Sequence, residues 1–168
     1  MTLEHAWWKA LSEAAAARGA GTKLALVDDR DLGRHGAHVA SFEDHIRYYA
    51  DPSCAANASF LDASVERTPT GSVPRLEGET PGDHVEELCG RVEAAGSSAY
   101  CVDVTSPDVA SLGLVVAKVV APELCMLDVV HPARFLGGER LYVAAAALGL
   151  RDGRLDERDV NPDPHPFP

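Results

Sequence analysis

Proline stands at every second position of the last eight residues, NPDPHPFP, which also carry His165 and Phe167. Alternating proline favours a polyproline II conformation, which rises about 3.1 Å per residue and so spans roughly 25 Å here. Because proline has no N–H group, such a segment can enter a cleft with few donors to satisfy. We expect it to hold Phe167 and the Pro168 carboxylate at a fixed depth, with His165 able to carry a proton near neutral pH. The alternatives are a disordered tail and a proline-rich ligand for another protein.

Three other stretches carry side chains that could bind a ligand or take part in chemistry. His45 and Tyr49 lie four residues apart in SFEDHIRYYADP and share one helix face, which suits either a substrate contact or a buried structural histidine. Asp103 and Thr105 follow a predicted strand end, where α/β proteins place functional groups. The same residue types in a turn instead satisfy backbone donors. Lys118 lies inside an apolar strand, so its stem either extends toward solvent or brings the ammonium group to an acidic partner.

Hydrophobic periodicity and capping residues predict the elements that position these side chains. The first helix follows a Thr2 cap and ends at Gly19 and Gly21, and the second begins after a Ser41 cap. Residues 23–33 either continue the first helix or form a strand. The predicted helices are residues 4–18, 42–51 and 82–96, and a last helix that begins at residue 140 and ends at Gly149 or Gly153. The predicted buried strands are AYCVDVT (99–105) and LVVAKVVAP (114–122), and the order of strand, connection and strand suggests one α/β layer.

Composition narrows the class of protein. The 168 residues carry a formal net charge of -11, which disfavours nonspecific binding to nucleic acid or to an anionic membrane. No stretch approaches the ~20 apolar residues of a membrane span, and the N-terminus does not resemble a signal peptide. The four cysteines, at positions 54, 89, 101 and 125, lack C-x-x-C spacing, so we expect small buried residues rather than a zinc site. These features predict a cytoplasmic protein.

Five segments, taken in order, resemble the C-terminal part of the YcaO family. ALSEAAAAR (10–18) is similar to the family's Ala-Leu-x-Glu nucleotide-contacting helix, and FEDHIRYYAD (42–51) to its His-x-x-x-Tyr helix. AYCVDVTSPDVASLGLVVAKVVAPEL (99–124) resembles its pattern of strand, Asp-x-Thr-x-Pro-Asp, Gly, strand and Pro. FLGGERLY (135–142) and the terminal NPDPHPFP complete the series, so the similarity extends along nearly the whole chain.

This resemblance implies an α+β fold: the C-terminal half of a YcaO protein, with helices packed on a small β-sheet, incomplete without a partner chain. Residues 1–160 would form this subdomain, with a mobile loop at about 66–82, and residues 161–168 would enter the active site. YcaO proteins bind ATP and Mg2+ and activate a backbone amide of a peptide. The products are azolines, thioamides or amidines, and a proline-rich C-terminus is typical of the azoline-forming branch.

The resemblance also assigns roles to individual residues. Glu13 and Arg18 would contact ATP, and Glu13 would also ligate Mg2+, although an exposed, solvated helix face is the plain alternative for this pair. His165 and Pro168 would take part in catalysis. The candidate substrate contacts are His45, Asp103, Thr105 and Lys118.

The sequence departs from the family in two ways. The glutamate-rich Mg2+ motifs of the type Ser-x-x-Glu-x-x-Glu-Arg, which precede the ALSEAAAAR helix in full-length members, are absent. The usual Gln and Arg are replaced by Ala16 and Lys118. We therefore expect one half of a split enzyme whose partner is a separate N-terminal YcaO half, acting on a precursor peptide, with a leader-peptide-binding protein as a further candidate partner. The alternatives are a degenerate YcaO fragment that regulates modification and a plain interaction domain.

Overall fold

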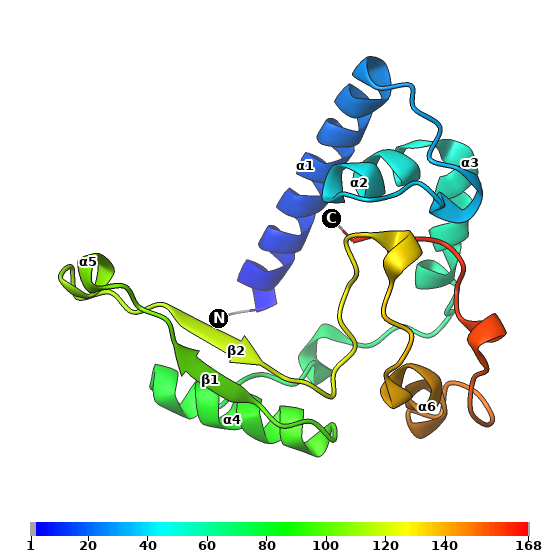
Figure 1. The fold of residues 1–168 in the computed structure, drawn as a ribbon. Coiled ribbons are helices and arrows are strands. Elements are labelled where there is room, and N and C mark those ends of the chain that lie inside the picture. The colour runs from blue at the N-terminus through cyan, green and yellow to red at the C-terminus, as the bar shows by residue number, and fades with distance from the viewer. Residues whose placement is uncertain (1–2, 168) are drawn as a thin grey trace. The chain divides into compact units, whose positions relative to one another are not determined.

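The computed structural model describes residues 3–167, which form two compact units (Figure 1). Unit 1 comprises residues 1–75, 126–137 and 152–168, and unit 2 comprises residues 76–125 and 138–151. Helices dominate both units, and the strands of the described residues form a single two-stranded antiparallel sheet. The fold is therefore α+β. The predicted Thr2 cap and the Pro168 carboxylate lie outside the described residues.

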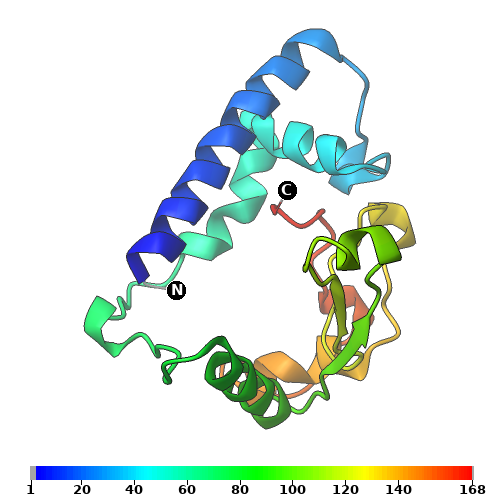
Figure 2. The same ribbon diagram turned by 90° about the vertical axis from the view of Figure 1, so that its left-hand side faces the viewer.

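Unit 1 contains the long helix α1 (Leu3–Val27), α2 (Phe42–Ala50) and the short α3 (Pro52–Ala55). Figures 1 and 2 show α2 in cyan beside the C-terminal part of α1 in blue. Short 3-10 segments fill much of the remainder: η1 (Arg34–Gly36), η2 (Ala56–Asp62), η3 (Thr70–Ser72), η4 (His131–Ala133) and η5 (Glu157–Asp159). The predicted loop at 66–82 contains η3 and otherwise lacks regular structure up to Pro81, where the next α-helix begins.

The first helix does not end at Gly19 and Gly21, so that prediction was wrong. The helix runs to Val27 because good helix formers follow, and an isolated glycine costs only about 1 kcal/mol in a helix interior. Gly21 has a packing reason: a Cβ there would lie 3.1 Å from Ala50 Cβ of α2. The glycine thus marks the closest approach of two helices rather than the end of one.

Helix α2 begins where the sequence predicts. Ser41 Oγ accepts a hydrogen bond from Asp44 N at 3.1 Å, and Glu43 and Asp44 occupy the first turn, where the helix dipole favours negative charge. The small core of unit 1 consists of Leu32, Val39 and Tyr48. Tyr48 therefore ties α2 to the loop that precedes it.

Unit 2 contains α4 (Pro81–Ala94), β1 (Tyr100–Asp103), α5 (Pro107–Ala110), β2 (Ala117–Val120) and α6 (Glu139–Ala147). A capping box between Thr80 and Asp83 begins α4. Gly149, at φ 69°, follows the C-terminal end of α6, as predicted for a helix stop. Strand β1 pairs antiparallel with β2, with Val102 opposite Lys118.

Both strands are exposed along their full length, so the prediction that they are buried was wrong. Val119 is 66% exposed and Tyr100 is 57% exposed. Apolar, β-branched sequence identified the strands correctly, but burial also requires an element that covers each face. The cysteines were likewise predicted to be buried, yet Cys101 and Cys125 are exposed and the other two are half-buried.

Candidate functional site

The C-terminal segment (Asn161–Phe167) packs against α2, the loop at residues 31–39 and residues 128–134, all within unit 1. The Pro164 side chain is fully buried. Its ring lies against Gly36, where an added Cβ would be 2.3 Å from Pro164 Cγ. Gly36 has φ +68°, which suits glycine, so the loop has both the space and the conformation to accept this ring.

Asp163 is the most heavily bonded side chain of the segment. Its Oδ1 accepts a hydrogen bond from the Tyr48 hydroxyl at 2.7 Å and another from Asn57 Nδ2 at 3.0 Å. His35 Nδ1 lies 3.0 Å from the same oxygen. Burial opposes ionisation of Asp163, but the hydrogen bonds from Tyr48 and His35 outweigh it and hold the pKa of this carboxyl below its usual range.

The main-chain carbonyls of the segment are held by side chains from the surrounding unit. His131 Nε2 lies 2.8 Å from the Pro162 oxygen, and Arg134 donates to the Asn161 oxygen at 2.6 Å. The Tyr49 hydroxyl donates to the Pro164 oxygen. Burial raises the pKa of Tyr49 to about 12, so its hydroxyl remains a proton donor at neutral pH.

His45 lies beneath the end of this segment and is 1% exposed. Its Nδ1 is 3.1 Å from the His165 carbonyl oxygen and its Nε2 is 3.0 Å from the Val129 oxygen. The rings of His45 and His165 stack with centroids 4.1 Å apart. Of the two interpretations open for His45, this geometry is that of a buried structural histidine, because both ring nitrogens already face main-chain carbonyls.

His165, predicted to carry a proton, is half-buried rather than free in solvent. Its Nε2 lies 3.2 Å from the Asp128 carbonyl oxygen. Burial, and then the proximity of His45, lower the pKa of His165 below its ordinary value. The ring is therefore neutral at pH 7 and can accept a proton but is a poor donor of one.

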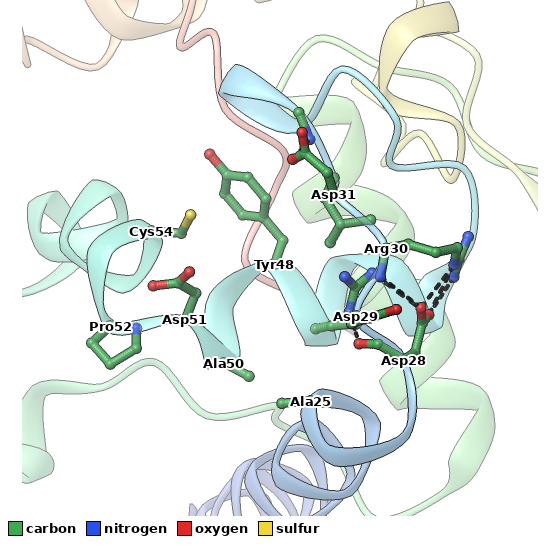
Figure 3. A pocket seen from close by; sticks show the side chains of 13 residues that line it. Ala25, Asp28, Asp29, Arg30, Asp31, Tyr48, Ala50, Asp51, Pro52 and Cys54 are labelled. Atoms are coloured by element: carbon green, nitrogen blue, oxygen red, sulfur yellow. Dashed lines mark hydrogen bonds and ion pairs between the residues drawn. The ribbon is translucent and has the colours of Figure 1, made fainter.

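A cavity of about 550 Å³ adjoins α2 and lies between the C-terminal end of α1, the loop that follows α1, and α3 (Figure 3). Arg30 binds both oxygens of Asp28, and Arg47 Nε donates to the Asp28 main-chain oxygen at 3.0 Å. The hydrogen bonds from Arg30 lower the pKa of Asp28 to about 2. Tyr48 lines this cavity and also binds Asp163, so one side chain connects the cavity with the C-terminal segment.

Glu13 and Arg18 are both exposed on α1. Five residues of α-helix separate the directions of two side chains by about 140°, so the helix does not bring this pair onto one face. Glu13 lies 3.8 Å from Lys9, and both side chains are about two-thirds exposed. Such a pair contributes little to stability, which leaves the Glu13 carboxylate available to another ligand.

The remaining predicted contacts belong to unit 2. Asp103 Oδ1 accepts from Thr105 N at 2.9 Å, and this turn lowers the pKa of Asp103. Thr105 Oγ1 accepts from Val116 N at 2.8 Å. Both side chains therefore satisfy backbone donors in the arrangement of a turn, and Lys118 is exposed on β2. His45, assigned to the same substrate site by resemblance, lies in unit 1.

Residues 3–167 contain no group of three or more His, Cys, Asp or Glu side chains placed to hold a metal ion. Glu13 alone does not constitute a Mg2+ site, since this ion requires several oxygen ligands. In the same part of the chain, no helix combines the length and apolar character needed to cross a bilayer.

Four residues of this region were missed by sequence reasoning: His35, Gly36, Asn57 and Asp163. Two signals could have indicated them. Arg34–Gly36 reads as a tight turn bounded by Gly33 and Gly36, and Asp163 is the only acidic side chain among the terminal prolines. Neither signal reveals that these positions, more than 100 residues apart, meet in the fold.

A protein-family model described as YcaO cyclodehydratase, ATP- and Mg2+-binding, matches residues 1–125 of the 168. The matched region contains α1, α2 and the strand pair, and it ends before FLGGERLY and the C-terminal segment. No curated protein and no solved structure matches the chain.

Proposed function

Because the chain belongs to the YcaO family, we propose that it is one subunit of a split YcaO enzyme. The substrate is a backbone amide of a ribosomally made precursor peptide. ATP donates its γ-phosphoryl group to the amide oxygen and ADP leaves. A Cys, Ser or Thr side chain of the peptide loses its S–H or O–H proton and bonds to the amide carbon. Phosphate leaves with the amide oxygen, the amide nitrogen loses its proton, and an azoline results. Formation of an amidine or a thioamide is the related chemistry that other nucleophiles would give.

The exposed apolar surface is the observation that carries the proposal. The accessible surface of the chain is 12577 Å². The accessible surface of a folded monomeric protein can be calculated from its mass. When the 17.8 kDa of this chain is divided between the two units according to their numbers of residues, the expected surfaces of the two units add up to about 9,600 Å². Permanent interfaces bury about 2,000–5,000 Å² counted over both partners. The excess of roughly 3,000 Å² is therefore enough to supply one partner's share of such an interface.

This surface is present in each unit. In unit 1, α1 buries only Gly21 among its described residues, while Trp8 and Leu11 are 71% and 68% exposed. In unit 2, the strand pair exposes Val102 and Val119 on a sheet with two free edges. Exposed apolar surface is typical of protein interfaces, and unpaired strand edges favour pairing with a further strand.

The partner that fits this proposal supplies acidic side chains. An Mg2+-bound triphosphate requires several oxygen ligands and cations for its phosphates, and this chain offers Glu13 and Arg18 as its predicted contribution. The weak, exposed pair between Glu13 and Lys9 is readily given up for a stronger ligand. A second polypeptide with a Glu-x-x-Glu-Arg motif would complete the set.

The test is coexpression with such a polypeptide, followed by measurement of peptide-dependent ATP turnover. We expect turnover only when both chains are present, and a fall of at least tenfold in Glu13→Gln and in Arg18→Gln. Glu4→Gln on the same helix is the control and should retain activity. Full turnover by this chain alone, or a complex indifferent to both substitutions, would contradict the proposal.

Ala16 and Lys118, which replace the usual Gln and Arg, favour a second candidate. In that case the chain is a degenerate YcaO fragment that binds a partner or a leader peptide and regulates modification. The same coexpression distinguishes the two: a stable complex whose turnover resides entirely in the partner would favour the regulator.

A further inference from the structure

We propose that the loop at residues 31–39, α2, Asn57 and residues 128–134 form a socket for the C-terminal segment, in which Asp163 is the positioning residue. Its carboxylate fixes where the segment enters and therefore how far Phe167 extends. The socket itself follows from the contacts in unit 1. Its role in amide activation rests on the proposed function.

Asp163 is the point at which separate parts of the socket converge. Tyr48 comes from α2, His35 from η1 and Asn57 from η2, and all three reach the same carboxylate oxygen within 3.0 Å. The Asp163 side chain is 9% exposed, so these partners replace most of its water. Burying this carboxylate without its three hydrogen-bond partners would cost free energy. The segment is therefore held in the register that places Asp163, and not a neighbouring residue, at this point.

The loop is shaped for this register. Glycine at position 36 leaves room for the Pro164 ring, because a Cβ there would meet the ring at 2.3 Å. Beside it, His35 adopts φ 54°, an unfavourable conformation for a residue with a side chain. That conformation is maintained where its ring can reach Asp163. A shift of the segment by one residue would place a non-proline side chain at Gly36 and move the carboxylate away from its three partners.

The contacts are strongest in the middle of the segment, at Asp163 and Pro164, and weaken toward its end. Pro164 is fully buried and its carbonyl is bound by Tyr49, while His165 is half-buried against His45. Phe167 is 50% exposed. A terminal segment with a purely structural role would be expected to bury its aromatic side chain, whereas this one buries Asp163 and Pro164. The segment is therefore fixed at Asp163 and Pro164, and Phe167 extends away from these contacts.

The first test uses the full chain labelled with 4-fluorophenylalanine, whose four 19F resonances are assigned with single Phe→Leu variants. In Asp163→Asn we expect the Phe167 resonance to move to its position in the free fluorinated peptide NPDPHPFP. The other three phenylalanine resonances should stay in place and report that the chain remains folded. Glu157→Gln, with the same change of charge six residues earlier, is the control. A Phe167 resonance unchanged by Asp163→Asn would overturn the socket.

The second test uses the complex with the partner subunit. We expect Asp163→Asn to lower kcat of peptide-dependent ATP turnover at least tenfold with little change in KM for ATP, while Glu157→Gln leaves both unchanged. A displaced Phe167 with a normal kcat would overturn the positioning role. A wild-type complex without turnover would refute the proposed function alone, and the 19F comparison would still decide the socket.

Discussion

Replacing Gly36 by alanine would place a methyl group where the buried Pro164 ring already lies. The new Cβ would be 2.3 Å from Pro164 Cγ and 2.8 Å from its Cδ. An L-residue at φ +68° costs about 1–2 kcal/mol, and forcing extra volume into a packed site costs about 1–3 kcal/mol more. We therefore expect Gly36→Ala to lower the free energy of unfolding by about 2–5 kcal/mol, or to release the C-terminal segment from its socket.

Urea unfolding of four variants separates the two contributions. Gly149 also has positive φ, at +69°, but a Cβ there meets nothing within 4 Å, so Gly149→Ala reports the backbone cost of about 1–2 kcal/mol alone. Pro164→Ala removes the atoms that clash, and in the double variant with Gly36→Ala the steric cost should disappear. The resulting coupling should be at least about 1 kcal/mol. Additive effects of Gly36→Ala and Pro164→Ala would refute the packing argument.

Three further predictions concern the same unit. Burial lowers the pKa of His131 and of His165, so the stability gained by keeping both rings neutral is complete above the unfolded pKa of about 6.5 and declines as the pH falls below it. The Phe167 19F resonance should therefore move toward the free-peptide position between pH 7 and pH 5, and an invariant resonance would contradict this. Removing the N-cap of α2 in Ser41→Ala should cost about 1 kcal/mol in urea unfolding, and an unchanged midpoint would show that the cap contributes nothing. Asp44→Ala should cost about 2–3 kcal/mol, because it removes a buried carboxylate that accepts a hydrogen bond from Ala40 N–H and pairs with Arg30. A loss below 0.5 kcal/mol would show that water replaces the carboxylate.

The sequence predicted local structure well where the signals are local. Ser41 identified the start of α2, and Gly149, one of the two glycines predicted as a stop, follows the end of α6. Each depends on hydrogen bonds or dihedral angles within a few residues. The end of α1 was wrong because Gly21 serves tertiary packing against α2, a requirement that helix propensity alone does not contain.

The burial of the strand pair was predicted from residue type and was wrong for the described residues. Val102 and Val119 have the character of a covered sheet, and the fold of this chain leaves them exposed. Residue type indicates that an apolar side chain favours a buried environment. Whether the side chain is buried depends on whether another element covers that face of the sheet.

The candidate site was predicted only in part. The terminal prolines indicated a segment that packs rather than one that forms a helix, and His45 was recognised as a candidate structural histidine. Asp163 was not identified, because its partners His35 and Tyr48 lie 115 or more residues earlier. Pairing over such separations follows from the fold, and no local pattern encodes it.

Four of the last eight residues are prolines, and these have no amide hydrogen. The socket accordingly holds the segment by its carbonyls and by one carboxylate, with groups such as Arg134 and Tyr49 on the other side. Methods that follow amide hydrogens, such as hydrogen exchange or 15N–1H spectra, therefore have at most four reporters within these eight residues, at Asn161, Asp163, His165 and Phe167. Carbon, fluorine or side-chain NMR signals would report more completely whether this segment is attached.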